Sequence, residues 1–228
     1  MITKLNDRIW TISVDFKVFG LVQLNGRCTI IRCSDGALWV HSPVRLTAEL
    51  KSQIDQIGQV KYLVAPSLFH HLFVGQWSEA YPEAKVYAPQ GLHKKQPHLR
   101  IDHILNPERG ENCYAWSKEI DHIAIEGMPA VNEFIFYERV SQTMLITDLC
   151  FYFKEAKGFT KLYLKLNKVY QKLNTPLLFK SVIKDKSAFK QSMQTLQEWA
   201  PKQISCCHHA ILTEEEIHLW EKLLKEYQ

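Results

Sequence analysis

Short apolar runs rich in Ile, Val, Thr and Trp dominate the first forty residues of the chain. Such runs are typical of β-strands, and we predict strands at residues 8–14, 27–33 and 37–42. The turn-forming residues 34–36 separate the last two of these strands, which predicts a hairpin.

The apolar positions then change to helical spacing. Between Thr47, a candidate N-cap, and Gly58, a candidate stop, they recur every three or four residues. Short buried strands at residues 60–66 and 84–89 flank a predicted helix at residues 71–81. The first part of the chain is therefore predicted to contain β-hairpins followed by alternating helices and strands.

The second part repeats this order after a polar segment, residues 91–114, that we predict to be rich in loops. Strands followed by helices, twice over, indicate two packed sheets with helices outside them. The predicted strands are residues 122–127, 133–139, 143–148 and 203–208, and the predicted helices are residues 161–173, 186–199 and 213–227, the last with Thr213 and Glu216 in capping-box spacing.

Ligand-type side chains follow three of these strands. His70 and His71 come after the strand that begins at residue 60, Asp148 closes the strand that begins at residue 143, and His208 closes the last strand. Binding residues gather at the carboxyl ends of strands in open α/β sheets. Two or three histidines with one carboxylate suit Zn, Fe or Mn. The alternative is that these are strand-end polar residues bonded to the backbone.

Two adjacent histidines are not expected to bind the same metal ion. Neighbours in a strand point to opposite faces, and neighbours in a helix lie about 100° apart. We therefore expect one ligand from the pair His70 and His71, and one from His208 and His209. His41 ends a strand and could face the same edge. The vicinal Cys206–Cys207 could supply soft metal ligands, but two small residues in a buried strand is the favoured interpretation.

Bulk composition is that of an ordinary globular protein, with 46% hydrophobic and 23% charged residues. We expect one domain spanning residues 1–228. The first ten residues carry no apolar signal region, and no run approaches 18 apolar residues. Six scattered cysteines form no CxxC pair, so reduced thiols in a cytoplasmic protein are expected.

Positive charge is concentrated in one segment. Residues 154–190 hold ten Lys and two acidic residues, or +8, so the remainder has 18 basic and 22 acidic residues, or −4. Between Lys161 and Lys190, basic amphipathic helices could make weak contact with an anionic membrane surface or steer an anionic substrate. A solvated face is the default interpretation. The segment has no Arg and few aromatics on its lysine face, which argues against specific nucleic-acid binding.

Four stretches together resemble a known superfamily. They are "DGALWVHSPVRLTAEL", "VKYLVAPSLFHHLFVGQWSEAYPEAKVYAPQGL", "LITDLCFYF" and "ISCCHHAI". They are similar to a poorly characterised branch of the metallo-β-lactamase-like superfamily, known only as a domain of unknown function. The resemblance extends from Trp10 to the last strand. It implies an α/β fold, the αββα four-layer sandwich of two mixed sheets with outer helices, and a metal site at one edge.

The same resemblance implies the metal ligands His70, His71, Asp148 and His208, with Asp148 and His70 as catalytic residues. The superfamily motif H-x-H-x-D-H is replaced here by "SLFHHLF", which lacks the Asp, and the turn "IEGMPAVNEF" lacks the usual His. Ser67 stands where the branch commonly has Asn. These departures imply fewer ligands than a two-metal hydrolase has, and Glu126 and Asp121 are candidate substitutes.

The sequence therefore leaves two functions open. The first is a metal-dependent hydrolase of a small substrate, for which an anionic molecule is a candidate, with a reduced, mononuclear site. Zn is the expected ion, and Fe or Mn are alternatives. The second is a non-catalytic binding or interaction protein of the same fold that has lost the full metal site, in which case the metal is absent.

Overall fold

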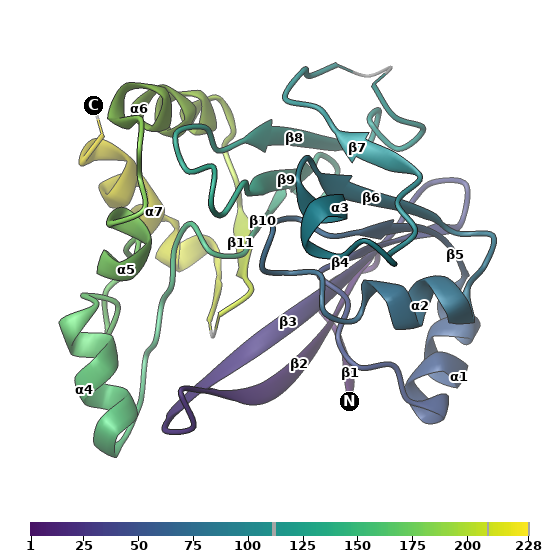
Figure 1. The fold of residues 1–228 in the computed structure, drawn as a ribbon, viewed down its shortest axis with the longest axis horizontal. Helices are drawn as coiled ribbons and strands as arrows, with labels where there is room; N and C mark the ends of the chain where they lie inside the picture. Colours follow the sequence, from purple (N-terminus) through teal and green to yellow (C-terminus); the bar gives the residue numbers. More distant parts are fainter. Residues whose placement is uncertain (111–112, 209, 228) are drawn as a thin grey trace.

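Two β-sheets pack face to face in the computed structural model, and helices cover both outer faces (Figure 1). The structure describes residues 1–110, 113–208 and 210–227, so His209 lies outside the described residues. The four-layer arrangement confirms the predicted αββα sandwich.

The larger sheet has seven strands in chain order. Its first four strands are antiparallel, whereas β4 to β7 run parallel to one another, so the carboxyl ends of β4 and β5 meet at one edge. The strands are β1 (Ile2–Lys4), β2 (Ile9–Val18), β3 (Val22–Arg32), β4 (Ala37–His41), β5 (Gln59–Val64), β6 (Lys85–Pro89) and β7 (His103–Leu105).

The smaller sheet has the strand order β12-β11-β10-β9-β8. The central pair, β10 and β11, is parallel, and the outer pairings are antiparallel. The chain therefore leaves β10 and β11 at the same edge. The strands are β8 (Ile120–Ala124), β9 (Phe134–Glu138), β10 (Thr143–Ile146), β11 (Gln203–Cys206) and β12 (Ile211–Leu212).

Helices α1, α2 and α3 cover the seven-stranded sheet, and α6 and α7 cover the five-stranded sheet (Figure 1). None of the helices in the described part of the chain reaches the length and hydrophobicity of a membrane span. Their bounds are α1 (Ala48–Ile57), α2 (Val74–Ala80), α3 (Leu92–Lys95), α4 (Gly158–Leu166), α5 (Leu177–Lys180), α6 (Lys186–Thr195) and α7 (Ile217–Lys225), with 3-10 turns η1 (Leu196–Glu198) and η2 (Glu214–Glu216).

Three apolar layers stabilise this arrangement. Trp39, Trp116 and Phe136 lie between the sheets with ring centroids 5.0 to 6.0 Å apart. Trp77 of α2 belongs to the layer outside the larger sheet, and Trp220 of α7 to the layer outside the smaller one. Burying large aromatic side chains is the main source of stability in such layers.

Two predicted helix starts agree with the structure, and one predicted helix end does not. The Thr47 cap is confirmed, because its hydroxyl accepts a hydrogen bond from the Leu50 N–H at 3.1 Å, and the Thr213 capping box is also present. The helix predicted at residues 161–173 is wrong at its end. It stops at Leu166, and Lys168 and Gln171 adopt left-handed φ values of 60° and 52°. A left-handed residue ends the α-helical hydrogen-bond ladder.

The β2–β3 hairpin is longer than predicted. The strands pair without interruption from Ile9↔Ile31 to Val18↔Val22, whereas the sequence prediction ended the first strand at Val14 and began the second at Arg27. Polar residues between Val14 and Arg27 interrupt the apolar runs from which the strands were predicted. The apolar face of this extension packs against a separate small cluster that includes Phe151 and Leu164.

His41, which the sequence allowed to face the edge, is buried in the core between the sheets. Its ring lies 5.8 Å from Trp39 and 5.6 Å from Phe136, measured between ring centroids. Burial, with a smaller contribution from the charge of His70, lowers the pKa of His41 to about 3. Burial among aromatic rings favours the neutral form of the imidazole, so protonating it costs folding free energy.

We predict that His41 makes the fold sensitive to acid. Because the folded-state pKa lies below the unfolded value of about 6.5, its contribution is fully present above pH 6.5 and is lost as the pH falls toward 3. At pH 5 the free energy of unfolding should be about 2 kcal/mol lower than at pH 7 through this group alone. Urea unfolding of wild type and His41→Leu at both pH values measures it. An equal pH-dependent loss in both proteins would contradict the assignment.

Candidate metal centre

Three loops meet at the edge where β5, β10 and β11 end. Asp148 follows β10 and Cys207 follows β11, and the parallel pairing of these strands places the two loops side by side, with the Cys207 N–H donating to the Ile146 carbonyl at 2.8 Å. The third loop, after β5, joins the other sheet through the Phe134 N–H, which donates to the Pro66 carbonyl at 2.8 Å. Residues from both sheets therefore converge here.

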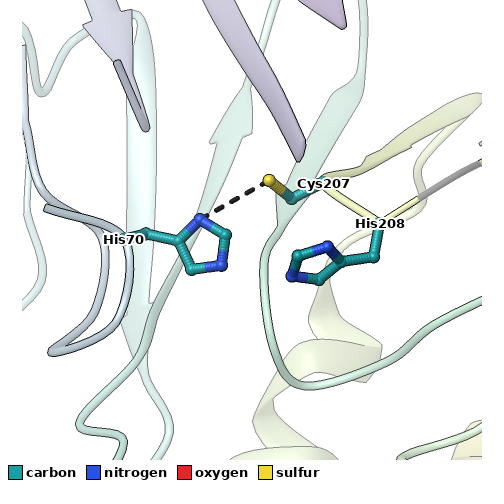
Figure 2. A group of neighbouring side chains, drawn as sticks. All are labelled: His70, Cys207 and His208. Atoms are coloured by element: carbon teal, nitrogen blue, oxygen red, sulfur yellow. Dashed lines mark hydrogen bonds between the residues drawn. The ribbon is translucent and has the colours of Figure 1, made fainter. Parts of the chain in front are cut away.

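His70, Cys207 and His208 form the centre of this edge (Figure 2). One possible ligand atom from each lies within 4.8 Å of the other two. The Nδ1 atom of His70 is 3.5 Å from the Cys207 sulfur, and the ring centroids of His70 and His208 are 5.2 Å apart. All three side chains are largely buried.

Asp148 lies against both imidazoles. Its Oδ1 atom is 3.3 Å from His70 Nε2 and 3.5 Å from His208 Nε2. The structure therefore brings together three of the four ligands predicted from sequence, His70, Asp148 and His208, and adds Cys207. Strand β11 ends at Cys206, so the side chains of Cys207 and His208 need not point to opposite faces of the sheet. Both can therefore join the cluster.

The fourth predicted ligand, His71, is directed elsewhere. It lines a separate cavity of about 220 Å³ with Leu72, Gly75, Gln96, His98 and Leu99. His70 and His71 are consecutive, and the chain turns toward α2 at this point, so the two imidazoles point in different directions. This is the divergence that the adjacent-residue argument expects.

The candidate substitutes for missing ligands also lie outside the cluster. Asp121 pairs with Arg109 and Arg139 at 3.0 and 3.1 Å, and Glu126 is exposed. The turn at residues 126–131, which lacks the usual His, makes a packing contact. A Cβ atom on Gly127 would lie 2.1 Å from the Asp185 carbonyl, so the turn packs directly on the start of α6.

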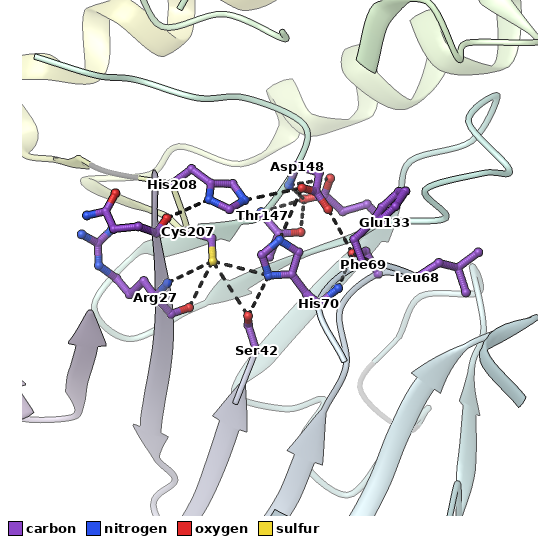
Figure 3. A network of polar contacts seen from close by, with 12 residues as sticks. Arg27, Ser42, Leu68, Phe69, His70, Glu133, Thr147, Asp148, Cys207 and His208 are labelled. Atoms are coloured by element: carbon purple, nitrogen blue, oxygen red, sulfur yellow. Dashed lines mark hydrogen bonds and ion pairs between the residues drawn. The ribbon is translucent and has the colours of Figure 1, made fainter. Parts of the chain in front are cut away.

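Backbone groups orient two of the side chains (Figure 3). His208 Nδ1 is 2.8 Å from the Asn25 carbonyl, so this nitrogen carries the proton and Nε2 presents its lone pair to the cluster. The Cys207 sulfur lies 3.2 Å from both the N–H and the carbonyl of Arg27. Ser42 donates to or accepts from His70 Nδ1 at 2.9 Å.

Ser67 and Glu133 hold the two loops that carry His70 and Asp148. The Ser67 hydroxyl accepts from the His70 N–H at 3.2 Å and donates to Asp148 Oδ2 at 3.1 Å. The buried Glu133 carboxyl accepts from the Thr147 N–H and hydroxyl, both at 2.7 Å, and from the Asp148 N–H at 3.1 Å. Neither residue was identified from the sequence as a supporting group, because Asp148 lies 81 residues from Ser67 and 15 from Glu133 in the chain.

Opposite charges and burial compete in the cluster. Burial raises and the His70 charge lowers the pKa of Cys207, with a net fall to about 6. Burial likewise opposes the charge on Asp148, but the two imidazoles hold the pKa of that carboxyl well below its usual range. Burial and the Asp148 charge raise the pKa of Glu133 to about 8. The cluster thus stabilises anionic donors next to imidazoles, which is the donor chemistry of a metal site.

The spacing of the donors fits a transition-metal ion. Bonds of about 2.0 Å to nitrogen or oxygen and about 2.3 Å to sulfur place tetrahedral ligand atoms about 3.3–3.6 Å apart. His70 Nδ1 and the Cys207 sulfur are 3.5 Å apart, and the ligand atoms of His70, Cys207 and His208 all lie within 4.8 Å of one another. Imidazole and thiolate are preferred by Zn²⁺.

Two facing sheets with outer helices and a His, Cys and Asp cluster at one strand edge define a metallo-β-lactamase-fold protein. Solved structures support this class. The chain has a TM-score of 0.66 and 13% identity to a metallo-β-lactamase from Pontibacter korlensis, with 99% of this chain and 98% of that chain covered. For the metallo-β-lactamase FIM-1 from Pseudomonas aeruginosa in its mono-zinc form, the TM-score is 0.65, the identity 11%, and the coverage 99% and 95%.

A third similar structure is the metal-soaked Flv1 flavodiiron core from Synechocystis sp. PCC6803, with a TM-score of 0.68, 9% identity, and coverage of 100% of this chain and 60% of that one. No curated protein sequence matches this chain. Residues 6–180 match the family described as a domain of unknown function, DUF4336. The chain belongs to that family, as the sequence resemblance implied.

We predict that Glu133 is a stability determinant of the edge. Glu133→Ala leaves the Thr147 and Asp148 donors buried without their acceptor, which should lower the free energy of unfolding by roughly 2–4 kcal/mol. The exposed Glu126→Ala is the matched control and should change stability by less than about 0.5 kcal/mol. Chemical denaturation measures both, and equal stability of the two variants would refute the role.

Proposed function

We propose that this chain is a metal-dependent hydrolase that binds one transition-metal ion, Zn²⁺ in the first place, through His70, Cys207 and His208. The observation that carries the proposal is the orientation of His70. Its Nδ1 atom faces Cys207, whereas its Nε2 atom faces Asp148. One ion cannot use both nitrogens of a single imidazole, so the thiol and the carboxylate serve different roles.

Three protein ligands leave one position of a tetrahedral ion open, and an open position distinguishes catalytic zinc sites from closed structural ones. When bound there, such an ion would lower the pKa of a coordinated water toward about 7 and polarise the bond to be cleaved. The reduced ligand set, without the His of the 126–131 turn, supports a mononuclear site.

Asp148 has the role of an orienting carboxylate in this proposal. By accepting a hydrogen bond from His70 Nε2, it fixes the tautomer whose Nδ1 lone pair faces Cys207 and Ser42. The Asn25 carbonyl does the same for His208 through Nδ1.

Aromatic rings limit the size of the substrate. The ring centroid of Phe151 is 4.4 Å from that of His208, and the ring centroid of Phe16, in β2, is 5.9 Å from it. A small ester, thioester, lactone or phosphodiester is therefore the proposed substrate class. All six cysteines are free thiols, which suits action in a reducing, cytoplasmic compartment.

A non-catalytic role is the second candidate, and the burial of the cluster favours it. Asp148, Cys207 and His208 are each exposed by 5% or less, and Phe151 lies directly against His208. A site closed in this way would bind an ion, or a small ligand, without turnover.

We predict that protein purified without chelator contains about one equivalent of a transition metal, measured by plasma mass spectrometry. His70→Ala, His208→Ala and Cys207→Ser should reduce the content below about 0.2 equivalents. Asp148→Asn should keep the ion with affinity lowered by about 10- to 100-fold, as expected for an orienting residue.

Matched controls are His71→Ala, whose imidazole lines the separate cavity, and the exposed Cys113→Ser. Both should retain the metal. If Asp148→Asn abolished binding while Cys207→Ser retained it, the ion would lie on the Nε2 side of His70, and the proposed ligand set would be wrong.

We predict hydrolysis of at least one member of an ester, thioester, lactone and phosphodiester panel by the metal-loaded protein. Removing the ion by chelation, or substituting His70→Ala, should lower kcat/KM by at least about 100-fold. Turnover should return when Zn²⁺ is restored to the chelated wild type. A protein that holds its metal and shows no turnover on the panel would favour the non-catalytic candidate.

A further inference from the structure

The tip of the β2–β3 hairpin presents two large apolar side chains to solvent. Phe19 is 76% exposed and Leu21 is 67% exposed. Phe19 adopts a left-handed φ of 52° and is followed by Gly20 at 70°. Asn, Asp or Gly is usual at such turn positions, so an exposed phenylalanine there is strained and gains nothing from the core.

The outward face of α4 is also apolar. Phe159, Leu162 and Leu166 recur at helical spacing and are 53%, 53% and 66% exposed. Leu164, the buried residue of this helix, lies on the opposite side of the helical wheel. Burial in the core therefore accounts for one face of α4 but not for the face that carries these three side chains.

The hairpin tip and α4 form one continuous surface. The Gln23 N–H of β3 donates to the Thr160 hydroxyl of α4 at 3.0 Å, and Leu164 shares a buried cluster with Val22 and Leu24. Both elements extend beyond the two sheets at the same end of the molecule, in the lower left of Figure 1.

Lysines are concentrated in the same two segments of the chain. Residues 154–172 contain six Lys and one Glu, and Lys17 adds a charge on the hairpin. The ammonium groups of Lys161 and Lys165 lie 5.1 and 5.8 Å from the Tyr170 ring. We call this set the basic–apolar surface: Phe19, Leu21, Phe159, Leu162 and Leu166 with Lys17, Lys157, Lys161 and Lys165.

We propose that the basic–apolar surface docks the protein on the surface of an anionic lipid bilayer. Apolar side chains at protruding tips can enter the acyl boundary, while the lysines contact anionic headgroups. A protein partner would need a hollow complementary to both the hairpin tip and α4, whereas a bilayer accommodates any arrangement of the two. The proposal does not depend on metal binding or catalysis.

Docking would also place the candidate metal centre near the membrane. Phe16 lies on the same strand as the hairpin tip, three residues before Phe19, and its ring is 5.9 Å from His208. A bound hairpin would therefore hold the edge of the metal centre close to the lipid surface.

Vesicle sedimentation tests the proposal. The full chain is mixed with phosphatidylcholine vesicles, or with the same vesicles containing phosphatidylglycerol, at low and high salt. We expect binding to the anionic vesicles about tenfold stronger than to the neutral ones, and weaker at high salt. The variant Phe19→Ser/Leu21→Ser, and separately Lys157→Gln/Lys165→Gln, should each weaken binding by about tenfold or more.

Matched controls lie outside the basic–apolar surface. Val140→Ser removes an exposed apolar side chain elsewhere, and Lys118→Gln/Lys222→Gln removes two exposed lysines. Both should bind like wild type, and thermal melting should show that all variants fold. Equal sedimentation with neutral and anionic vesicles would overturn the proposal. So would a dimer in solution that Phe19→Ser/Leu21→Ser dissociates, because a second copy would then cover the surface.

Discussion

The Asp148 carboxylate lies buried between the imidazoles of His70 and His208, and the arrangement of the edge depends on this contact. A buried carboxylate is costly unless it is paired and hydrogen-bonded. Here His70 comes from the loop after β5 in one sheet, and Asp148 and His208 come from loops after β10 and β11 in the other. Satisfying one charge therefore requires that both sheets keep their relative position.

The supporting groups follow from the same requirement. Ser67 bonds the second carboxylate oxygen, and Glu133 accepts from the backbone N–H of Asp148. On the other side of His70, Cys207 is held between the N–H and carbonyl of Arg27. His70 therefore separates a carboxylate side from a thiol side, and this separation allows the proposed site to hold one ion with an open position.

Much of the fold could be predicted from the sequence, because the strands carry strong apolar runs and Thr47 and Thr213 mark helix starts. The long hairpin could not, because its polar positions interrupt the pattern between Val14 and Arg27. At the edge, His70, Asp148 and His208 were found from their places after strands. Cys207 was considered but not favoured, because strand alternation no longer applies once the chain has left β11.

The most direct test of the central claim is anomalous X-ray diffraction at the metal edge, from crystals of protein purified without chelator. The account predicts a single anomalous peak about 2.0–2.3 Å from His70 Nδ1, the Cys207 sulfur and a His208 nitrogen. A peak bonded to Asp148 and His70 Nε2, or no peak at an otherwise ordered edge, would contradict it.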